Sequence, residues 1–133
     1  MKIIKDILIA EFMGGELTEN EKIIFGEKEI PLRDLKYSES WELIMGVVEK
    51  IENTDCSKFA YSWDMDGELR YNYYHPIVEI AGGTCWIYFD CELDPSFTIN
   101  DMSFKKRFDS KLLAVYEGVC EFIEWYNFRI KND

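Results

Sequence analysis

The feature that most constrains the fold of this chain is a long apolar repeat close to its end. Between residues 110 and 130, apolar side chains recur at intervals of three and four over more than four helical turns, at Leu112, Val115, Val119, Phe122, Tyr126 and Ile130. Such spacing places them all on one face of an α-helix. Asp109 and Ser110 are both suitable N-caps. The pattern predicts a long helix from one of these residues to about Ile130, with one face buried.

A second helix is predicted at the start of the chain, over residues 2–13. Its main apolar stripe is expected to be Ile4, Leu8 and Phe12, with Ile3, Ile7 and Ala10 beside it. Gly14 and Gly15 follow, and glycine readily adopts the left-handed conformation that ends a helix.

A third helix is predicted to begin near Ser38 or Ser40, with Glu39 and Glu42 at its positive end. Its buried stripe is expected to be Trp41, Ile44, Val48 and Ile51. Gly46 weakens such a helix by ~1 kcal/mol relative to alanine. Residues 53–55 are polar and are expected to end it.

The segments between the helices are predicted to form β-strands joined by tight turns. Residues 23–25 and 28–30 flank a turn at Gly26-Glu27, and residues 59–65 lead into a turn at Asp66-Gly67. Gly82-Gly83 joins residues 76–81 to residues 84–91. This turn sets Val78 opposite Ile87 and Ile80 opposite Cys85, which predicts a core face shared by Val78, Ile80, Cys85, Ile87, Phe89 and Cys91. Residues 92–101 are polar and are expected to form a loop.

The predicted fold class follows from this order of elements. The 133 residues provide one hydrophobic core and little room for a second, so residues 1–133 are expected to form a single globular domain. We predict an α+β fold in which an antiparallel meander of about three to five strands packs against an N-terminal, a central and a long C-terminal helix.

The charge balance disfavours several classes of partner. With 26 acidic and 15 basic residues, the net charge is −11. Nucleic acids and anionic membranes reward basic surfaces, so we expect neither direct nucleic-acid binding nor membrane binding. The apolar start of the chain is interrupted by Asp6 and Glu11, unlike a signal peptide. We therefore expect a cytoplasmic protein.

The metal-binding and redox-active residue types are sparse. The four cysteines, Cys56, Cys85, Cys91 and Cys120, form no Cys-x-x-Cys pair, and His75 is the only histidine. These spacings do not suit a zinc site, and free thiols are expected in a cytoplasmic chain. Asp64-Met65-Asp66-Gly67 resembles part of a calcium loop, but that alignment puts Tyr73 where a bidentate carboxylate is needed. We predict no metal and no cofactor.

No set of catalytic residues can be assigned. His75 has neither a nucleophile nor an orienting acid that the sequence identifies, and is better interpreted as a surface or packing residue. Cys120 lies among the acidic residues Glu117, Glu121 and Glu124, whereas a reactive thiol requires basic neighbours.

Two groups of residues are candidates for binding a partner protein. Glu117, Glu121 and Glu124 share one face of the last helix, as either a solvated face or an acidic stripe for a basic partner. The aromatic residues between positions 59 and 75 cannot all be buried by strand alternation, so some of them should be exposed, with Trp63, Tyr71, Tyr73 and Tyr74 as the candidates. Lys105-Lys106-Arg107 is the one basic cluster and is interpreted as a solvated turn or an anion-contacting loop.

Three segments resemble a family of small uncharacterised proteins from bacteriophages and bacterial mobile elements. They are residues 41–51 (WELIMGVVEKI), residues 111–127 of the last helix and residues 9–14 (IAEFMG). That family would have proline at Gly46, which implies a helix that begins around Met45 with Trp41 in a preceding turn. The resemblance implies a phage or mobile-element setting and no particular activity.

The leading hypothesis is a non-enzymatic accessory protein that binds another protein. An acidic surface could imitate a phosphate backbone and so inhibit a nucleic-acid-binding protein of the host. The alternative is a small-ligand binding domain or an enzyme that uses the tyrosine-rich hairpin as one wall of its pocket. A concave pocket with converging polar groups would favour this alternative.

Overall fold

The computed structural model describes residues 2–56, 75–89 and 104–132, together with the backbone of residues 62–63, 69–70 and 98–99. This part of the chain contains three α-helices, α1 (Lys2–Phe12), α2 (Trp41–Glu52) and α3 (Lys111–Asn132), and one 3-10 turn, η1 (Leu32–Asp34). Three strands follow α1 directly and form an antiparallel meander, β1 (Glu16–Leu17), β2 (Lys22–Phe25) and β3 (Lys28–Pro31). The fold is α+β, as predicted.

Two further three-stranded antiparallel sheets lie later in the chain. One has the order β6 (Pro76–Ala81), β7 (Thr84–Phe89) and β9 (Phe104–Arg107). The other has the order β5 (Leu69–Arg70), β4 (Ser62–Trp63) and β8 (Thr98–Ile99). None of the helices in the described ranges has the length and the apolar character that crossing a bilayer requires.

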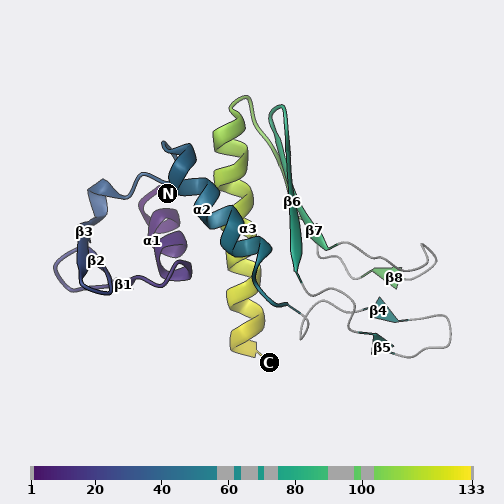
Figure 1. Cartoon of the computed structure of the whole chain (residues 1–133), viewed down its shortest axis with the longest axis horizontal. Coiled ribbons are helices and arrows are strands. Elements are labelled where there is room, and N and C mark those ends of the chain that lie inside the picture. Colours follow the sequence, from purple (N-terminus) through teal and green to yellow (C-terminus); the bar gives the residue numbers. More distant parts are fainter. Residues whose placement is uncertain are drawn as a thin grey trace.

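Helix α3 stands at the centre of the molecule (Figure 1). The sheet β6–β7–β9 packs along one side of it, and α1 and α2 pack along the other. Ser110 caps the helix, because its Oγ accepts the N–H of Leu113 at 3.2 Å. Val115, Val119 and Phe122 are fully buried, as the apolar repeat predicts, and Tyr126 is half-buried. The core of the molecule therefore surrounds α3.

The hairpin of β6 and β7 has the predicted register. Val78 lies opposite Ile87 and Ile80 lies opposite Cys85. Cys85, Ile87 and Phe89 are buried on the face toward α3, whereas Cys91 lies outside the described residues. Gly83 is required at the turn, because a Cβ atom there would lie only 2.0 Å from the carbonyl oxygen of Phe108. The backbones of these two residues also form a hydrogen bond, in which the Phe108 N–H donates to the Gly83 carbonyl at 2.7 Å.

Helix α2 has the predicted N-cap but not the whole predicted stripe. Ser40 Oγ accepts the N–H of Leu43, so the helix begins at Trp41 and not near Met45. Trp41 is 41% exposed, which corrects the prediction that it is buried. The buried residues are Ile44, Val47, Val48 and Ile51. Trp41 lies in the first turn and to one side of the line that these four residues define, so it reaches the edge of the core only.

Helix α1 is rotated relative to the predicted stripe. Its buried residues are Asp6, Ile9, Ala10 and Phe12, whereas Ile3 and Ile4 are 47% and 61% exposed. Polar contacts with α3 explain the rotation. The hydroxyl of Tyr116 donates to Asp6 Oδ1 at 3.0 Å, and Lys5 Nζ donates to Glu117 at 2.5 Å. These contacts turn the Asp6 side of α1 toward α3, and Ile4 away from it.

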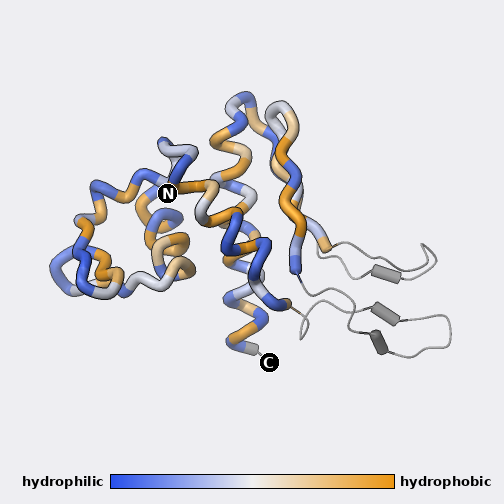
Figure 2. Tube along the Cα trace, viewed as in Figure 1, coloured by the Kyte–Doolittle hydropathy of each residue, from blue (hydrophilic) through white to orange (hydrophobic). Residues whose placement is uncertain are grey.

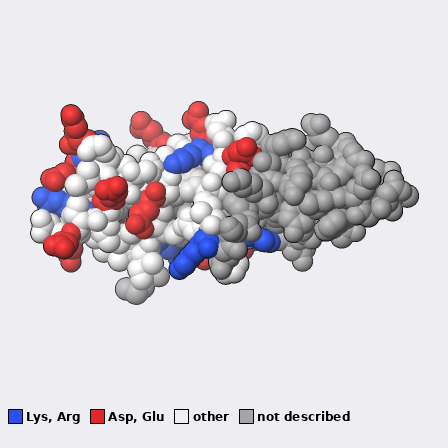
Figure 3. Space-filling model, turned by 90° about the horizontal axis from the view of Figure 1, so that it is seen from below, with Lys and Arg blue, Asp and Glu red and all other residues white. Residues whose placement is uncertain are grey.

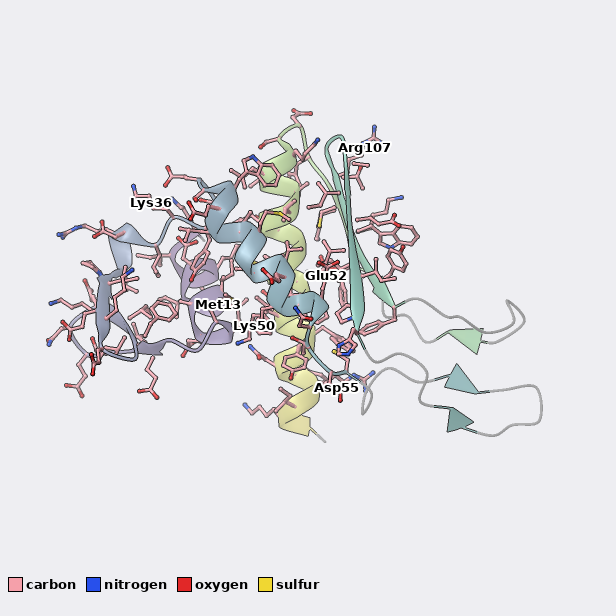
Figure 4. All side chains as sticks on the ribbon, in the orientation of Figure 1. Met13, Lys36, Lys50, Glu52, Asp55 and Arg107 are labelled. Carbon is pink, nitrogen blue, oxygen red and sulfur yellow. The ribbon has the colours of Figure 1, made fainter. Side chains whose placement is uncertain are left out.

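The C-terminal ends of α1 and α2 are fixed by side chains. Lys50 of α2 and Met13 lie close together in Figure 4, where Lys50 Nζ donates to the carbonyl of Phe12 at the end of α1. Glu52 lies beside β6 in the same view, and its Oε2 accepts the N–H of Val78 at 3.5 Å. Helix α2 is thereby joined to both α1 and the sheet.

Two segments predicted to be irregular form strands. Within residues 92–101, predicted as a loop, Thr98 and Ile99 pair with β4. The basic cluster Lys105-Lys106-Arg107 belongs to β9, where Cys85 lies opposite Lys106 and Trp86 opposite Lys105. The free edge of β7 supplies backbone partners that a solvated turn would lack. Pairing with that edge therefore outweighs the polar composition of β9.

Candidate functional site

The three glutamates of the predicted acidic stripe have different environments. Glu117 is half-buried, with 21% of its side chain exposed, and its two carboxylate oxygens lie 2.5 and 2.6 Å from Lys5 Nζ. Glu121 lies 2.5 Å from Lys106 Nζ, and this hydrogen bond raises the pKa of Lys106. Glu124 is exposed. Two of the three charges are thus neutralised by lysines from α1 and β9, and Glu117 does not face outward as predicted.

The aromatic candidates lie outside the described side chains. Tyr71, Tyr73 and Tyr74 are not among the described residues, and only the backbone of Trp63 is described. The backbone of Trp63 pairs with that of Leu69, and the turn predicted at Asp66-Gly67 lies outside the described residues. His75 is exposed, and its Nδ1 lies 3.1 Å from the carbonyl oxygen of Thr54. Because a carbonyl only accepts, that nitrogen carries the proton.

The N-terminal meander carries a denser group of acidic residues. We call it the acidic meander, and it consists of the exposed residues Glu16, Glu19, Glu21, Glu27 and Glu29. The same segment has two lysines, Lys22 and Lys28, and Lys22 Nζ lies 3.9 Å from Glu29. In the described part of the chain, no ion pair involves the other four glutamates. Figure 3 shows acidic side chains around this end of the molecule.

The sequence holds a signal for the acidic meander that the predictions did not use. Five glutamates fall within residues 16–29, a higher density than in the last helix. What the sequence cannot reveal is which glutamates meet a lysine. Lys5 is 112 residues away from Glu117 in sequence, and only the docking of α1 on α3 brings them together.

An open hollow of about 450 Å³ lies beside the acidic meander. Its walls are apolar at Ile3, Pro31 and Leu32, and polar at Asn20, Glu21, Lys22 and Arg33. None of these residues is a serine, threonine, cysteine or histidine, so the hollow provides no side-chain nucleophile of those types. Across the described residues, no three side chains of the metal-binding types lie close enough to hold an ion.

The described cysteines are buried free thiols, at Cys56, Cys85 and Cys120. Burial raises the pKa of Cys56 to about 12, that of Cys85 to about 11 and that of Cys120 to about 12. Thiolates, and not thiols, are the nucleophiles and metal ligands. These three residues are therefore packing residues at neutral pH.

The outward face of the sheet β6–β7–β9 carries an aromatic pair, the exposed Trp86 and the half-buried Tyr88. The rings of Trp86 and Tyr88 lie 4.4 Å apart, and Lys105 Nζ lies 5.7 Å from the centre of the Trp86 ring. The Tyr88 hydroxyl donates to Glu79 Oε1 at 2.5 Å. Exposed tryptophan and tyrosine are typical of protein contact surfaces. The sequence pattern predicted the inward face of this hairpin as core, and no role was predicted for its outward face.

Comparisons of this chain with protein-family models, with curated proteins and with solved structures found no match.

Proposed function

We propose that this chain is a non-enzymatic accessory protein of a bacteriophage or mobile element that binds a basic partner protein through the acidic meander. The observation that carries the proposal is the exposure of Glu16, Glu19, Glu21 and Glu27 without an ion pair to any described residue. Uncompensated carboxylates repel one another and gain from a partner that supplies arginine or lysine. The three segments that resemble phage proteins support the setting.

The partner class follows from the charge. Proteins that bind nucleic acids present clusters of lysine and arginine, which neutralise phosphates. A cluster of carboxylates on a protein of net charge −11 attracts the same clusters. Occupying them would block nucleic-acid binding, so we propose that the partner is a nucleic-acid-binding protein of the host and that the effect is inhibition.

The test uses two variants with the same net charge. Glu16, Glu19 and Glu27 are changed together to glutamine in one, and the exposed residues Glu42, Glu49 and Glu124 in the other. We expect the meander variant to bind the protein captured from host lysate at least ~10-fold more weakly and with a flatter salt dependence. The α2–α3 variant should bind within ~3-fold of the unmodified chain.

Competition with DNA tests the inhibitory mode. If the captured protein uses its nucleic-acid site, added duplex DNA should release it, because the two anionic surfaces compete for the same cations. Equal loss of binding in both triple variants would argue against the acidic meander. If added DNA does not release the captured protein, the chain does not occupy its nucleic-acid site. That result would argue against inhibition and would leave a protein–protein role at another site of the partner.

The alternative function, a small-ligand site or an enzyme at the tyrosine-rich hairpin, concerns residues outside the described side chains. The hollow at Ile3, Lys22 and Arg33 belongs to a different part of the molecule and gives this alternative no support.

A further inference from the structure

The outward face of the sheet β6–β7–β9 contains a row with an acid at one edge and a base at the other. The strand register sets Glu79 opposite Trp86, and Trp86 opposite Lys105, so that the three residues are neighbours across the sheet. All three are exposed, Trp86 by 37%. We call them the Glu79–Trp86–Lys105 row.

The composition of β6 and β7 is typical of strands that are covered on both faces. A sheet with one face in water alternates apolar and polar residues, whereas a sheet covered on both faces is apolar almost throughout. The sequences are PIVEIA in β6 and TCWIYF in β7, in which Glu79 and Thr84 are the polar residues, and Figure 2 shows orange stretches along this hairpin between paler and blue ones. Helix α3 covers the inward face at Cys85 and Ile87. Ile77 and Trp86 on the outward face are the residues that a second layer would cover.

A two-fold axis parallel to β7, placed above the outward face, makes the row complementary to itself. Such an axis exchanges the two edge strands, so β6 of one copy faces β9 of the other. Glu79 then lies over Lys105 of the second copy, Lys105 lies over Glu79, and the two Trp86 rings meet at the centre. Arg107 lies over the small side chain of Ala81, since both belong to the next row, with Thr84 between them.

We propose that two copies of this chain associate face to face through the outward side of β6–β7–β9, with the Glu79–Trp86–Lys105 row at the two-fold axis. The partner is a second copy because the row carries both members of the charge pair, one on each side of Trp86. An unrelated basic or acidic partner would satisfy only one end of the row. Isologous contacts of this kind are the commonest form of self-association.

The size of the surface predicts a weak dimer. Two strands of six residues and one of four, about 4.8 Å apart, present roughly 260 Å² from each copy. Stable interfaces bury about 1,200 Å² or more in total. Association should therefore be reversible and depend on protein concentration.

Sedimentation equilibrium over about 10 to about 1,000 μM protein tests the proposal. The average mass of the unmodified chain should rise toward that of a dimer with increasing concentration. E79K and K105E should each weaken association by ~10-fold or more, because each sets like charges against one another twice. The double variant E79K/K105E exchanges the two charges and should restore association to within ~3-fold of the unmodified chain.

A matched control separates this effect from net charge. E49K changes the net charge by the same amount as E79K at an exposed site of α2, and association should stay within ~3-fold of the unmodified chain. Thermal unfolding of all variants shows that they are folded, since the changed side chains are exposed. A chain that remains monomeric throughout the range would overturn the proposal. So would a double variant as weak as the single ones.

Discussion

Asp6 is the buried acidic residue of the described core. Its protonation is therefore coupled to the stability of the fold. It is 3% exposed, and burial raises its pKa above the ordinary value of 3.8, although the Tyr116 hydrogen bond and Lys2 oppose this shift and Glu39 adds to it. The Tyr116 hydroxyl has one proton and two acceptors, Asp6 Oδ1 at 3.0 Å and the Lys2 carbonyl at 3.2 Å. The raised pKa shifts the Asp6 carboxyl toward its protonated form, which could itself donate to the Tyr116 oxygen.

Asp6→Asn should therefore change how stability depends on pH. Because the pKa of Asp6 is higher in the folded chain, its contribution is fully present below pH 3.8 and is lost as pH rises through the folded pKa. Asparagine imitates the protonated acid, so the variant should be more stable than the unmodified chain at pH 7, by about 1 kcal/mol. Urea unfolding across the pH range measures this difference. An equal pH slope in both proteins would mean that folding does not raise the pKa of Asp6.

The two glycines inside helices should respond to alanine in opposite directions. A Cβ atom at Gly46 of α2 meets no atom within 4 Å, so Gly46→Ala should stabilise the chain by roughly 0.5–1 kcal/mol. A Cβ atom at Gly118 of α3 would lie 3.0 Å from Cys85 Sγ, where the helix touches β7. Gly118→Ala should destabilise the chain by about 1–3 kcal/mol. Denaturant unfolding of the two variants, measured in parallel, decides whether α3 packs as closely as described.

At the scale of the elements, the sequence predicts α3 and the β6–β7 hairpin well because each carries its own pattern. The repeat from Leu112 to Tyr126 lies on the face toward the core, although Ile130 at its end is exposed, and the Gly82-Gly83 turn fixes one register. Helix α1 has apolar residues on two sides, so its pattern fits more than one rotation. Contacts with Tyr116 and Glu117, more than 100 residues away in sequence, determine which rotation α1 adopts.

Strand β9 and the ion pairs of the acidic residues were harder to predict, because both depend on contacts between residues distant in sequence. Strand β9 reads FKKR and has no apolar alternation, so only the free edge of β7 makes it a strand. Glu117 and Glu121 look alike in sequence but pair with Lys5 and Lys106, which local patterns cannot connect. Local patterns identify the elements, whereas the pairing of charges depends on how the elements dock.

Phe122→Ala tests the packing of α3 as an element. Phe122 is fully buried, and its ring centre lies 5.8 Å from that of Phe104, 5.7 Å from that of Trp125 and 6.5 Å from that of Phe12. It thus joins α3 to both β9 and α1. Its removal should cost ~3–5 kcal/mol of unfolding free energy, the range for a large aromatic residue lost from a core.

Guanidinium unfolding measures the loss, and Ile130→Ala serves as the control on the same helix. Ile130 is 51% exposed, so its truncation should stay within ~1 kcal/mol of the unmodified chain. Similar losses in the two variants would mean that α3 is turned differently about its axis.

At the scale of the whole molecule, α3 separates two surfaces of different character. The acidic meander lies at one side of it and the sheet β6–β7–β9 at the other (Figure 1). Arg107, at the end of β9, lies on the sheet side of α3, across the helix from the meander (Figure 4). A dimer formed through the sheet would leave both acidic meanders accessible, so binding of the basic partner and self-association can be measured independently.

The docking of the first helix on the last has a consequence for the order of events during synthesis. Lys5 and Tyr116 each make contacts across more than 110 residues of chain, to Glu117 and to the Lys2 carbonyl. While the ribosome is still adding α3, the side of α1 that contacts α3 has no partner, and contacts so distant in sequence form late. The chain therefore completes its fold only after its last helix has been translated. A premature stop before α3 would leave α1, α2 and the sheet without their common support.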